Sequence, residues 1–130
     1  TADEISVPSD KMLILPGGMP GTKNLDASPI TDRLIRETVA SGGHLAAICA
    51  APMILGKRGL LVGKRATCYP GFEDSLTGAT VVSAYAVSDG KIITATGAGA
   101  AVSFGGALVS ALCGEEKADE LLKAFRYTGV

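Results

Sequence analysis

The chain has few of the residues on which several kinds of functional site depend. It contains one histidine, no tryptophan and only 5% aromatic residues in a length of 130. Its twelve basic and thirteen acidic side chains nearly cancel, and there is no basic run or ladder of aromatic residues. Because nucleic-acid binding needs concentrated positive charge and stacking aromatics, this composition argues against a nucleic-acid partner.

Long apolar runs and closely spaced cysteines are also missing. No apolar stretch reaches the length of a membrane-spanning helix, so no membrane partner is expected. The three cysteines, Cys49, Cys68 and Cys113, lie far apart without the spacing of metal-binding motifs, and we expect no metal or other cofactor. An odd, sparse set of cysteines favours reduced thiols and a cytoplasmic location over a disulfide framework.

What is present suffices for one packed domain over residues 1–130, with 47% hydrophobic and 19% charged residues. Residues 11–15 form a short apolar run typical of a buried strand, and a Pro- and Gly-rich loop follows at 16–21. Ser28-Pro29 predicts a helix start, and Gly42-Gly43 predicts its end. With the next strand at 45–48, this spacing indicates a βαβ unit with a parallel pair.

The stretch from His44 to Pro52 carries the candidate site. The apolar run 45–48 predicts a strand buried on both faces, which Cys49 ends. Ala50-Ala51-Pro52 then predicts a sharp reversal into a helix that runs to Gly56 or Lys57. A thiol at such a strand–turn–helix corner, the nucleophile-elbow pattern, meets backbone N–H groups that favour the thiolate. The alternative is that Cys49 is a buried, inert packing residue.

The second half of the chain predicts three strands and two helices. A short strand is expected at 66–69, and two longer strands at 80–87 and 91–96 are joined by a hairpin turn at 88–90. A helix is expected from about 100 to 112, and Gly105-Gly106 inside it indicates close packing. The last helix, 115–125, is amphipathic, with Leu121, Leu122 and Phe125 facing inward.

Four segments together resemble the ThiJ/PfpI superfamily, in the branch of the Parkinson-associated redox protein and its bacterial YajL-type relatives. They are residues 15–18, 46–52, 64–70 and 89–99, which keep the family's order along nearly the whole chain. The resemblance implies a flavodoxin-like α/β sandwich with a mostly parallel sheet and a late β-hairpin. It matches the later two-thirds of the family domain, so we expect a fold that is incomplete at its N-terminus, without the family's opening β–α–β segment.

The resemblance also assigns the site. It implies that Cys49 is the reactive cysteine and that the backbone N–H groups of Gly18 and Ala50 are oxyanion donors. Gly17, Tyr69 and Cys68 are expected to line the site, although an ordinary turn would also explain the two glycines. The family's acidic partner of the cysteine would lie before the first residue of this chain, and loop carboxylates at 73–74 are poor substitutes.

Two positions depart from other branches of the family. Tyr69 stands where many members have a histidine, and a phenol with a pKa near 10 is a poor general base at neutral pH. Ala50 stands where the protease-like branch has a histidine directly after the cysteine, so a Cys–His pair is absent. The only histidine, His44, lies five residues before Cys49, on the opposite face of the same strand.

Four functions remain open at this point. The first is glyoxalase- or deglycase-type chemistry, in which Cys49 adds to a small reactive carbonyl. The second is a redox-sensing stress protein or chaperone, in which an oxidant modifies Cys49. The third, 4-methyl-5-(β-hydroxyethyl)-thiazole monophosphate biosynthesis, is a label that such sequences carry without support from these residues, and the fourth, a peptidase, is disfavoured by Ala50. The expected partner is a second copy in a homodimer, or an N-terminal segment supplied in trans.

Overall fold

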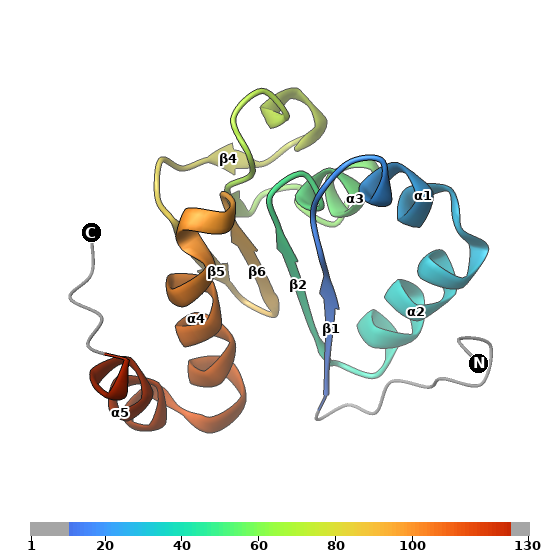
Figure 1. Ribbon diagram of the computed structural model, residues 1–130. Helices are drawn as coiled ribbons and strands as arrows, with labels where there is room; N and C mark the ends of the chain where they lie inside the picture. Colours follow the sequence, from blue (N-terminus) through green and yellow to red (C-terminus); the bar gives the residue numbers. More distant parts are fainter. Residues whose placement is uncertain (1–10, 126–130) are drawn as a thin grey trace.

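A computed structural model describes residues 11–125 and contains a four-stranded sheet between two sets of helices (Figure 1). The strand order is β1 (Met12–Leu15), β2 (His44–Ile48), β6 (Ile92–Ala95), β5 (Ala86–Asp89). Strands β1, β2 and β6 run parallel, and β5 pairs antiparallel with β6 as a hairpin. The predicted α/β class, with a mostly parallel sheet and a late hairpin, is confirmed.

The helices divide between the two faces of the sheet (Figure 1). One face carries α1 (Gly21–Ala27), α2 (Pro29–Ala40) and α3 (Pro52–Lys57), and the other carries α4 (Ala101–Cys113), against which α5 (Glu115–Ala124) packs. Because α2 connects the parallel strands β1 and β2, the predicted βαβ unit is present. Helix α1 was not predicted, since its sequence follows directly on a loop rich in proline and glycine.

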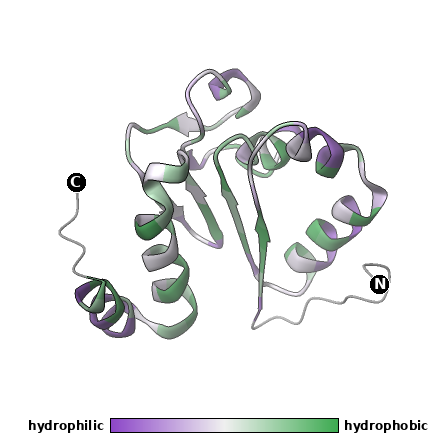
Figure 2. Ribbon diagram, in the orientation of Figure 1, coloured by the Kyte–Doolittle hydropathy of each residue, from purple (hydrophilic) through white to green (hydrophobic). Residues whose placement is uncertain are grey.

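Strand β2 is apolar from Leu45 to Ile48, where it is covered on both faces. Leu45 belongs to the apolar cluster beneath α2 and α3, together with Ile35 and Ile54. The next residue, Ala46, belongs to the cluster beneath α4, together with Phe104. Successive side chains on a strand point to opposite faces, so the continuous apolar run is what two helical layers require. Figure 2 shows β1 and β2 as apolar strands.

The segment between α3 and β5 differs most from its prediction. It forms a second, two-stranded parallel sheet of β3 (Arg65–Ala66) and β4 (Thr80–Val81), with a 3-10 turn at Glu73–Ser75 between them. The strand expected at 66–69 therefore ends at residue 66. The single strand expected at 80–87 is wrong, because its first part pairs with β3 and its last part pairs with β6.

The hairpin turn lies two residues later than predicted. Ser88 and Asp89 are not turn residues but the last residues of β5, opposite Ile93 and Ile92. Asp89 has a tertiary role there, since its carboxylate accepts a hydrogen bond of 2.8 Å from the Arg65 N–H. This contact joins the two sheets, and the turn is formed by Lys91 together with Gly90, whose φ of +59° suits glycine.

Close packing of α4 against α5 explains one of the two helix-interior glycines. A Cβ on Gly106 would lie 3.3 Å from the Leu122 side chain, whereas one on Gly105 would meet nothing within 4 Å. The inward face of α5 consists of Ala118 and Leu122, which lie one turn apart. The prediction that Leu121 and Phe125 also face inward is wrong, since Phe125 is 65% exposed beyond the end of this face.

Candidate functional site

Cys49 lies in the sharp turn between β2 and α3. Its φ is +65°, and no other non-glycine residue in the described part of the chain has a positive φ. This backbone conformation costs an L residue roughly 1–2 kcal/mol, so neighbouring contacts must hold it. The Cys49 N–H donates to the Ala95 carbonyl at 3.0 Å, and the Cys49 carbonyl accepts from the Tyr69 N–H at 2.8 Å. Two other chain segments therefore fix the turn from different sides.

The helix after the turn is short. It begins at Pro52, which lies in its first turn as expected, and has six residues, ending at Lys57. The backbone N–H groups near the thiol therefore belong to the turn itself more than to a long helix with a large dipole.

The glycine loop after β1 lies directly against the Cys49 turn. A Cβ on Gly17 would overlap the Cys49 Cβ, and it would lie 2.7 Å from the Ile48 carbonyl oxygen and 3.4 Å from the Cys49 Sγ. The loop is held in place because the Gly18 carbonyl accepts hydrogen bonds from both the N–H (2.9 Å) and the hydroxyl (2.8 Å) of Thr22. An ordinary turn would not need a glycine at position 17, whereas this close approach does.

Two backbone N–H groups of the candidate site have no acceptor among the described residues. Within residues 11–125, neither the Gly18 N–H nor the Ala50 N–H makes a hydrogen bond. Ala50 is a buried residue, and a buried N–H without an acceptor is uncommon in proteins. The glycine loop and the Cys49 turn thus each carry one backbone donor that no described residue engages.

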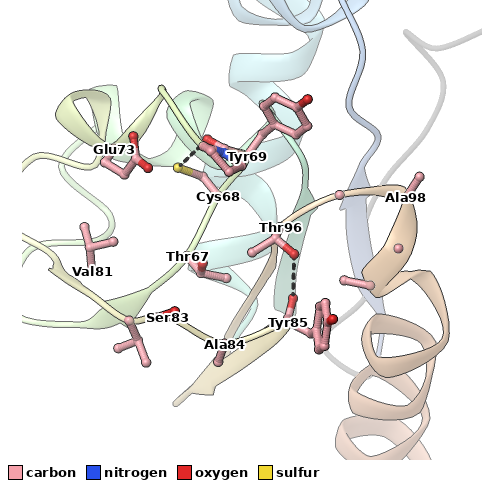
Figure 3. A pocket seen from close by; sticks show the side chains of 15 residues that line it. Thr67, Cys68, Tyr69, Glu73, Val81, Ser83, Ala84, Tyr85, Thr96 and Ala98 are labelled. Atoms are coloured by element: carbon pink, nitrogen blue, oxygen red, sulfur yellow. Dashed lines mark hydrogen bonds between the residues drawn. The ribbon is translucent and has the colours of Figure 1, made fainter. Parts of the chain in front are cut away.

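Cys68 and Tyr69 lie beside the Cys49 turn but line a separate cavity of 950 Å³ (Figure 3). Cys49 is not among the lining residues of this cavity. The Cys68 thiol is 4% exposed and donates to the Tyr69 carbonyl at 3.4 Å. Burial, together with the negative charge of Glu73, raises the pKa of Cys68 to about 11, so this thiol is protonated at neutral pH.

Tyr69 is half exposed and closes one side of the same cavity. Its ring would lie 3.4 Å from a Cβ on Gly97 and packs edge-on against Phe72, with ring centroids 6.4 Å apart. Glu73, one of the acidic residues considered as a partner for Cys49, accepts a 2.7 Å hydrogen bond from the Gly71 N–H in its own loop. Its charge bears on Cys68.

The remaining titratable candidates lie elsewhere. His44 begins β2, at the opposite end from Cys49, and burial together with the nearby Lys91 lowers the pKa of its imidazole. Cys113 is exposed at the last residue of α4. The structure therefore brings Gly17, Ala50 and Tyr69 to Cys49 but leaves the only histidine away from it.

Sequence reasoning missed most of the cavity wall. Ser83 and Tyr85 reach it from the segment between β4 and β5, which was predicted to be a continuous strand. Residues 96–99, which directly follow β6, form another part of the cavity wall. Their small side chains could have indicated from the sequence that this segment leaves space for a cavity. No local pattern marks Ser83 or Tyr85.

Metal and membrane sites receive no support from the described residues. Residues 11–125 include no group of three or more His, Cys, Asp or Glu side chains that could hold a metal ion. In the same range, no helix is both long enough and apolar enough to cross a membrane.

The proteins that this chain resembles belong to one family. The DJ-1/PfpI family profile matches residues 1–111. Protein DJ-1 homolog A of Arabidopsis thaliana is 41% identical over 113 residues, which are 85% of this chain and 29% of the relative. A Caenorhabditis elegans protein, glutathione-independent glyoxalase DJR-1.2, is 37% identical over 114 residues, which are 86% of this chain and 60% of the relative.

A solved structure, that of oxidised Toxoplasma gondii DJ-1, matches with a TM-score of 0.85 and 30% identity over 98% of this chain and 67% of the other. The chain spans between about a quarter and three-fifths of the length of the two relatives named above. Because a family profile covers most of its length and the fold agrees, the chain belongs to the DJ-1/PfpI family.

Proposed function

We propose that Cys49 is a nucleophile toward small reactive carbonyl compounds, in chemistry of the glyoxalase or deglycase type. The observation that carries this proposal is the strained backbone at Cys49, which sets the thiol against the glycine loop, where the N–H groups of Gly18 and Ala50 are not engaged by the described residues. The name of the Caenorhabditis elegans relative, a glutathione-independent glyoxalase, supports this substrate class.

The proposed first step is addition of the thiolate to an aldehyde such as methylglyoxal. A bond forms between the Cys49 sulfur and the aldehyde carbon, and the π electron pair of the carbonyl moves to its oxygen. The N–H groups of Gly18 and Ala50 donate to that oxygen, since neither is engaged by the described residues. Fixed backbone donors of this kind stabilise the developing negative charge without reorganising.

Lactate formation from methylglyoxal tests this proposal. We expect lactate from the wild-type chain and none from Cys49→Ala, because the alanine cannot add to the aldehyde. Cys113→Ala is the matched control, since it removes an exposed thiol at the end of α4, and its rate should equal that of the wild type. Equal rates for Cys49→Ala and the wild type would contradict the proposal.

A second candidate is a redox-sensing stress protein or chaperone that uses the same thiol without turnover. Cys49 is partly exposed, and one structural neighbour was solved in an oxidised form. In this case mild peroxide should convert Cys49 to the sulfinate, adding about 32 mass units to the intact chain. Sulfinate formation without lactate would favour this second function.

Neither of the other two candidate functions is supported by the described residues. Thiazole monophosphate biosynthesis has no supporting residue, and peptidase activity lacks a base, because Ala50 and Tyr69 occupy the two positions where family members carry histidine. We also propose a cytoplasmic location for this single domain, since an odd, sparse set of cysteines is typical of proteins in reducing compartments.

We also propose that β1 is covered by another polypeptide segment. Within the described residues β1 pairs only with β2, and its Ile14 side chain is 48% exposed. Unpaired strand edges beside apolar surface attract a further strand. A β–α–β segment supplied in trans, or a second copy of the chain in a homodimer, would cover both.

Adding the opening segment of a full-length relative to this chain separates these two partners. If the segment is supplied in trans, methylglyoxal turnover should rise sharply, and it should stay flat when the glutamate of that segment is replaced by alanine. A dimer of the chain alone, seen by analytical ultracentrifugation and unaffected by the segment, would favour the homodimer.

A further inference from the structure

We propose that Cys68 is a resolving cysteine for Cys49. A hydroperoxide first oxidises Cys49 to the sulfenic acid, and Cys68 then captures it as an intramolecular disulfide. This inference rests on the reactivity proposed above for Cys49. It gives a chemical role to a second thiol that the carbonyl chemistry does not use.

The segment that carries Cys68 is bonded directly to the Cys49 turn. The Tyr69 N–H donates to the Cys49 carbonyl at 2.8 Å, so the residue just before Tyr69 lies alongside the turn. Cys68 is therefore one residue away from a direct backbone hydrogen bond to Cys49. A disulfide between the two needs their Cα atoms to come within roughly 4.4–6.8 Å of each other.

Two further observations connect the thiols. The charge of Cys49 contributes to the raised pKa of Cys68, so the two groups lie within electrostatic reach of each other. The Cys68 thiol also has only a 3.4 Å hydrogen bond to the Tyr69 carbonyl to give up before it can turn, and the 950 Å³ cavity of Figure 3 beside it leaves the surrounding side chains room to adjust. Cys113, exposed at the end of α4, shares neither feature.

The chemistry balances with the hydroperoxide as the only oxidant. The Cys49 thiolate attacks one peroxide oxygen, the O–O bond breaks, and hydroxide or alkoxide leaves while sulfur is oxidised by two electrons. Cys68 then releases its proton to solvent, its thiolate attacks the sulfenic sulfur and a disulfide bond forms, and the departing hydroxide takes up a proton from solvent to give water. With hydrogen peroxide, the two thiols and one peroxide yield one disulfide and two waters.

The environment of Cys68 makes the second step slow at neutral pH. Only the thiolate attacks, and burial raises the pKa of Cys68 to about 11. The thiolate fraction, and with it the capture rate, should rise about tenfold per pH unit below that value. Further oxidation of the Cys49 sulfenate needs a second peroxide molecule. At low peroxide concentrations Cys68 therefore has time to capture the sulfenate, whereas excess peroxide carries Cys49 on to the sulfinate.

The experiment treats the whole chain with stoichiometric hydrogen peroxide between pH 7 and pH 9. Non-reducing peptide mapping should find a Cys49–Cys68 linkage that dithiothreitol reverses and whose yield grows with pH. Cys68→Ser should lose the linkage and give several times more Cys49 sulfinate. Cys113→Ser should match the wild type in both measurements, and circular dichroism should show that all three chains are folded.

A wild-type sample in which Cys49 is oxidised without linkage to Cys68 at any of these pH values would overturn the inference. Equal sulfinate yields in the wild type and Cys68→Ser would do the same. Failure of the proposed nucleophile is recognised separately by limiting iodoacetamide. If it labels Cys113 or Cys68 before Cys49, the proposed function fails together with the resolving role, whereas prior labelling of Cys49 leaves the two questions independent.

Discussion

The two faces of the sheet are covered unequally. Under α2 and α3, side chains such as Ile54 and Leu55 are completely buried, and ion pairs from Arg58 to Asp26 and Asp32 join the three helices of this face. On the other face α4 packs on β5 and β6, while Ile14 of β1 is half exposed. We call the face covered by α1, α2 and α3 the closed face and the face that carries α4 the open face. We expect the closed face to supply most of the stability of the chain, and we expect the open face to contact other polypeptides.

The largest effect on stability is expected from removing a buried side chain on the closed face. Ile54→Ala removes a side chain that is 0% exposed at the centre of the larger apolar cluster, and it should lower the free energy of unfolding by about 3 kcal/mol. Urea denaturation measures the change. Val39→Ala, on the exposed side of α2, is the control and should cost under about 0.5 kcal/mol. Similar losses for both variants would show that the closed face is not tightly packed.

The glycine loop at the end of β1 gives the next effect. Gly17→Ala places a methyl group against the Cys49 Cβ and the Ile48 carbonyl, so we expect a loss of about 2 kcal/mol and a several-fold slower reaction of Cys49 with iodoacetamide. Gly105→Ala, where a methyl group meets nothing within 4 Å, should leave both quantities unchanged or raise stability slightly. An unaltered labelling rate in Gly17→Ala would show that the glycine loop does not influence the reactivity of the Cys49 thiol.

The ion pairs of the closed face should give the stability a characteristic pH dependence. Burial alone would raise the pKa of Asp26, but hydrogen bonds from Arg58 (2.7 Å) and Lys57 (2.9 Å) outweigh it and lower the pKa below 3.8. A depressed carboxyl pKa stabilises the fold above the unfolded-state value, and this stability is lost as pH falls through the folded-state value.

Asp26→Asn should therefore cost about 1 kcal/mol at pH 7 and progressively less below pH 4, as measured by urea denaturation at each pH. Glu120→Gln is the control, because its pair with Lys117 lies on exposed side chains of α5 and should contribute little at any pH. A loss in Asp26→Asn that is the same at pH 3 and pH 7 would mean that packing rather than charge joins these helices.

The smallest effect in the isolated chain is expected at Ile14. Ile14→Ser should change the free energy of unfolding by less than about 1 kcal/mol, since half of the side chain is already in water. The same substitution should weaken association with a β1-covering segment at least several-fold, which isothermal titration would detect. Undiminished binding by Ile14→Ser would remove this surface from the proposed interface.

Sequence patterns predicted the parts of the fold that depend on neighbours along the chain. The two-sided burial of 45–48 and the Cys49–Pro52 turn were both readable, because strand polarity and turn chemistry are local. The family resemblance then added the place of Gly17 beside the cysteine, which the close approach of the two residues agrees with.

The parts that could not be predicted depend on distant residues. The chain at 80–87 changes sheets because β3 takes up its first residues and β6 its last, and no spacing within the segment reveals that. For the same reason Tyr85 could not be assigned to the cavity, and Asp89, a good turn former, is held in a strand by the distant Arg65.

The excursion between Tyr69 and Tyr85 has a consequence for how relatives of this chain can diverge. At its start the Tyr69 N–H is bonded to the Cys49 carbonyl, and at its end the Tyr85 carbonyl accepts from the Thr96 N–H at 3.0 Å. Both ends are thus fixed next to the main sheet by backbone hydrogen bonds of their own, although Leu76 between them belongs to the core. Insertions and deletions in the exposed stretches between these anchors should therefore accumulate in evolution without moving Cys49, so that homologous chains reshape the cavity while keeping the same turn.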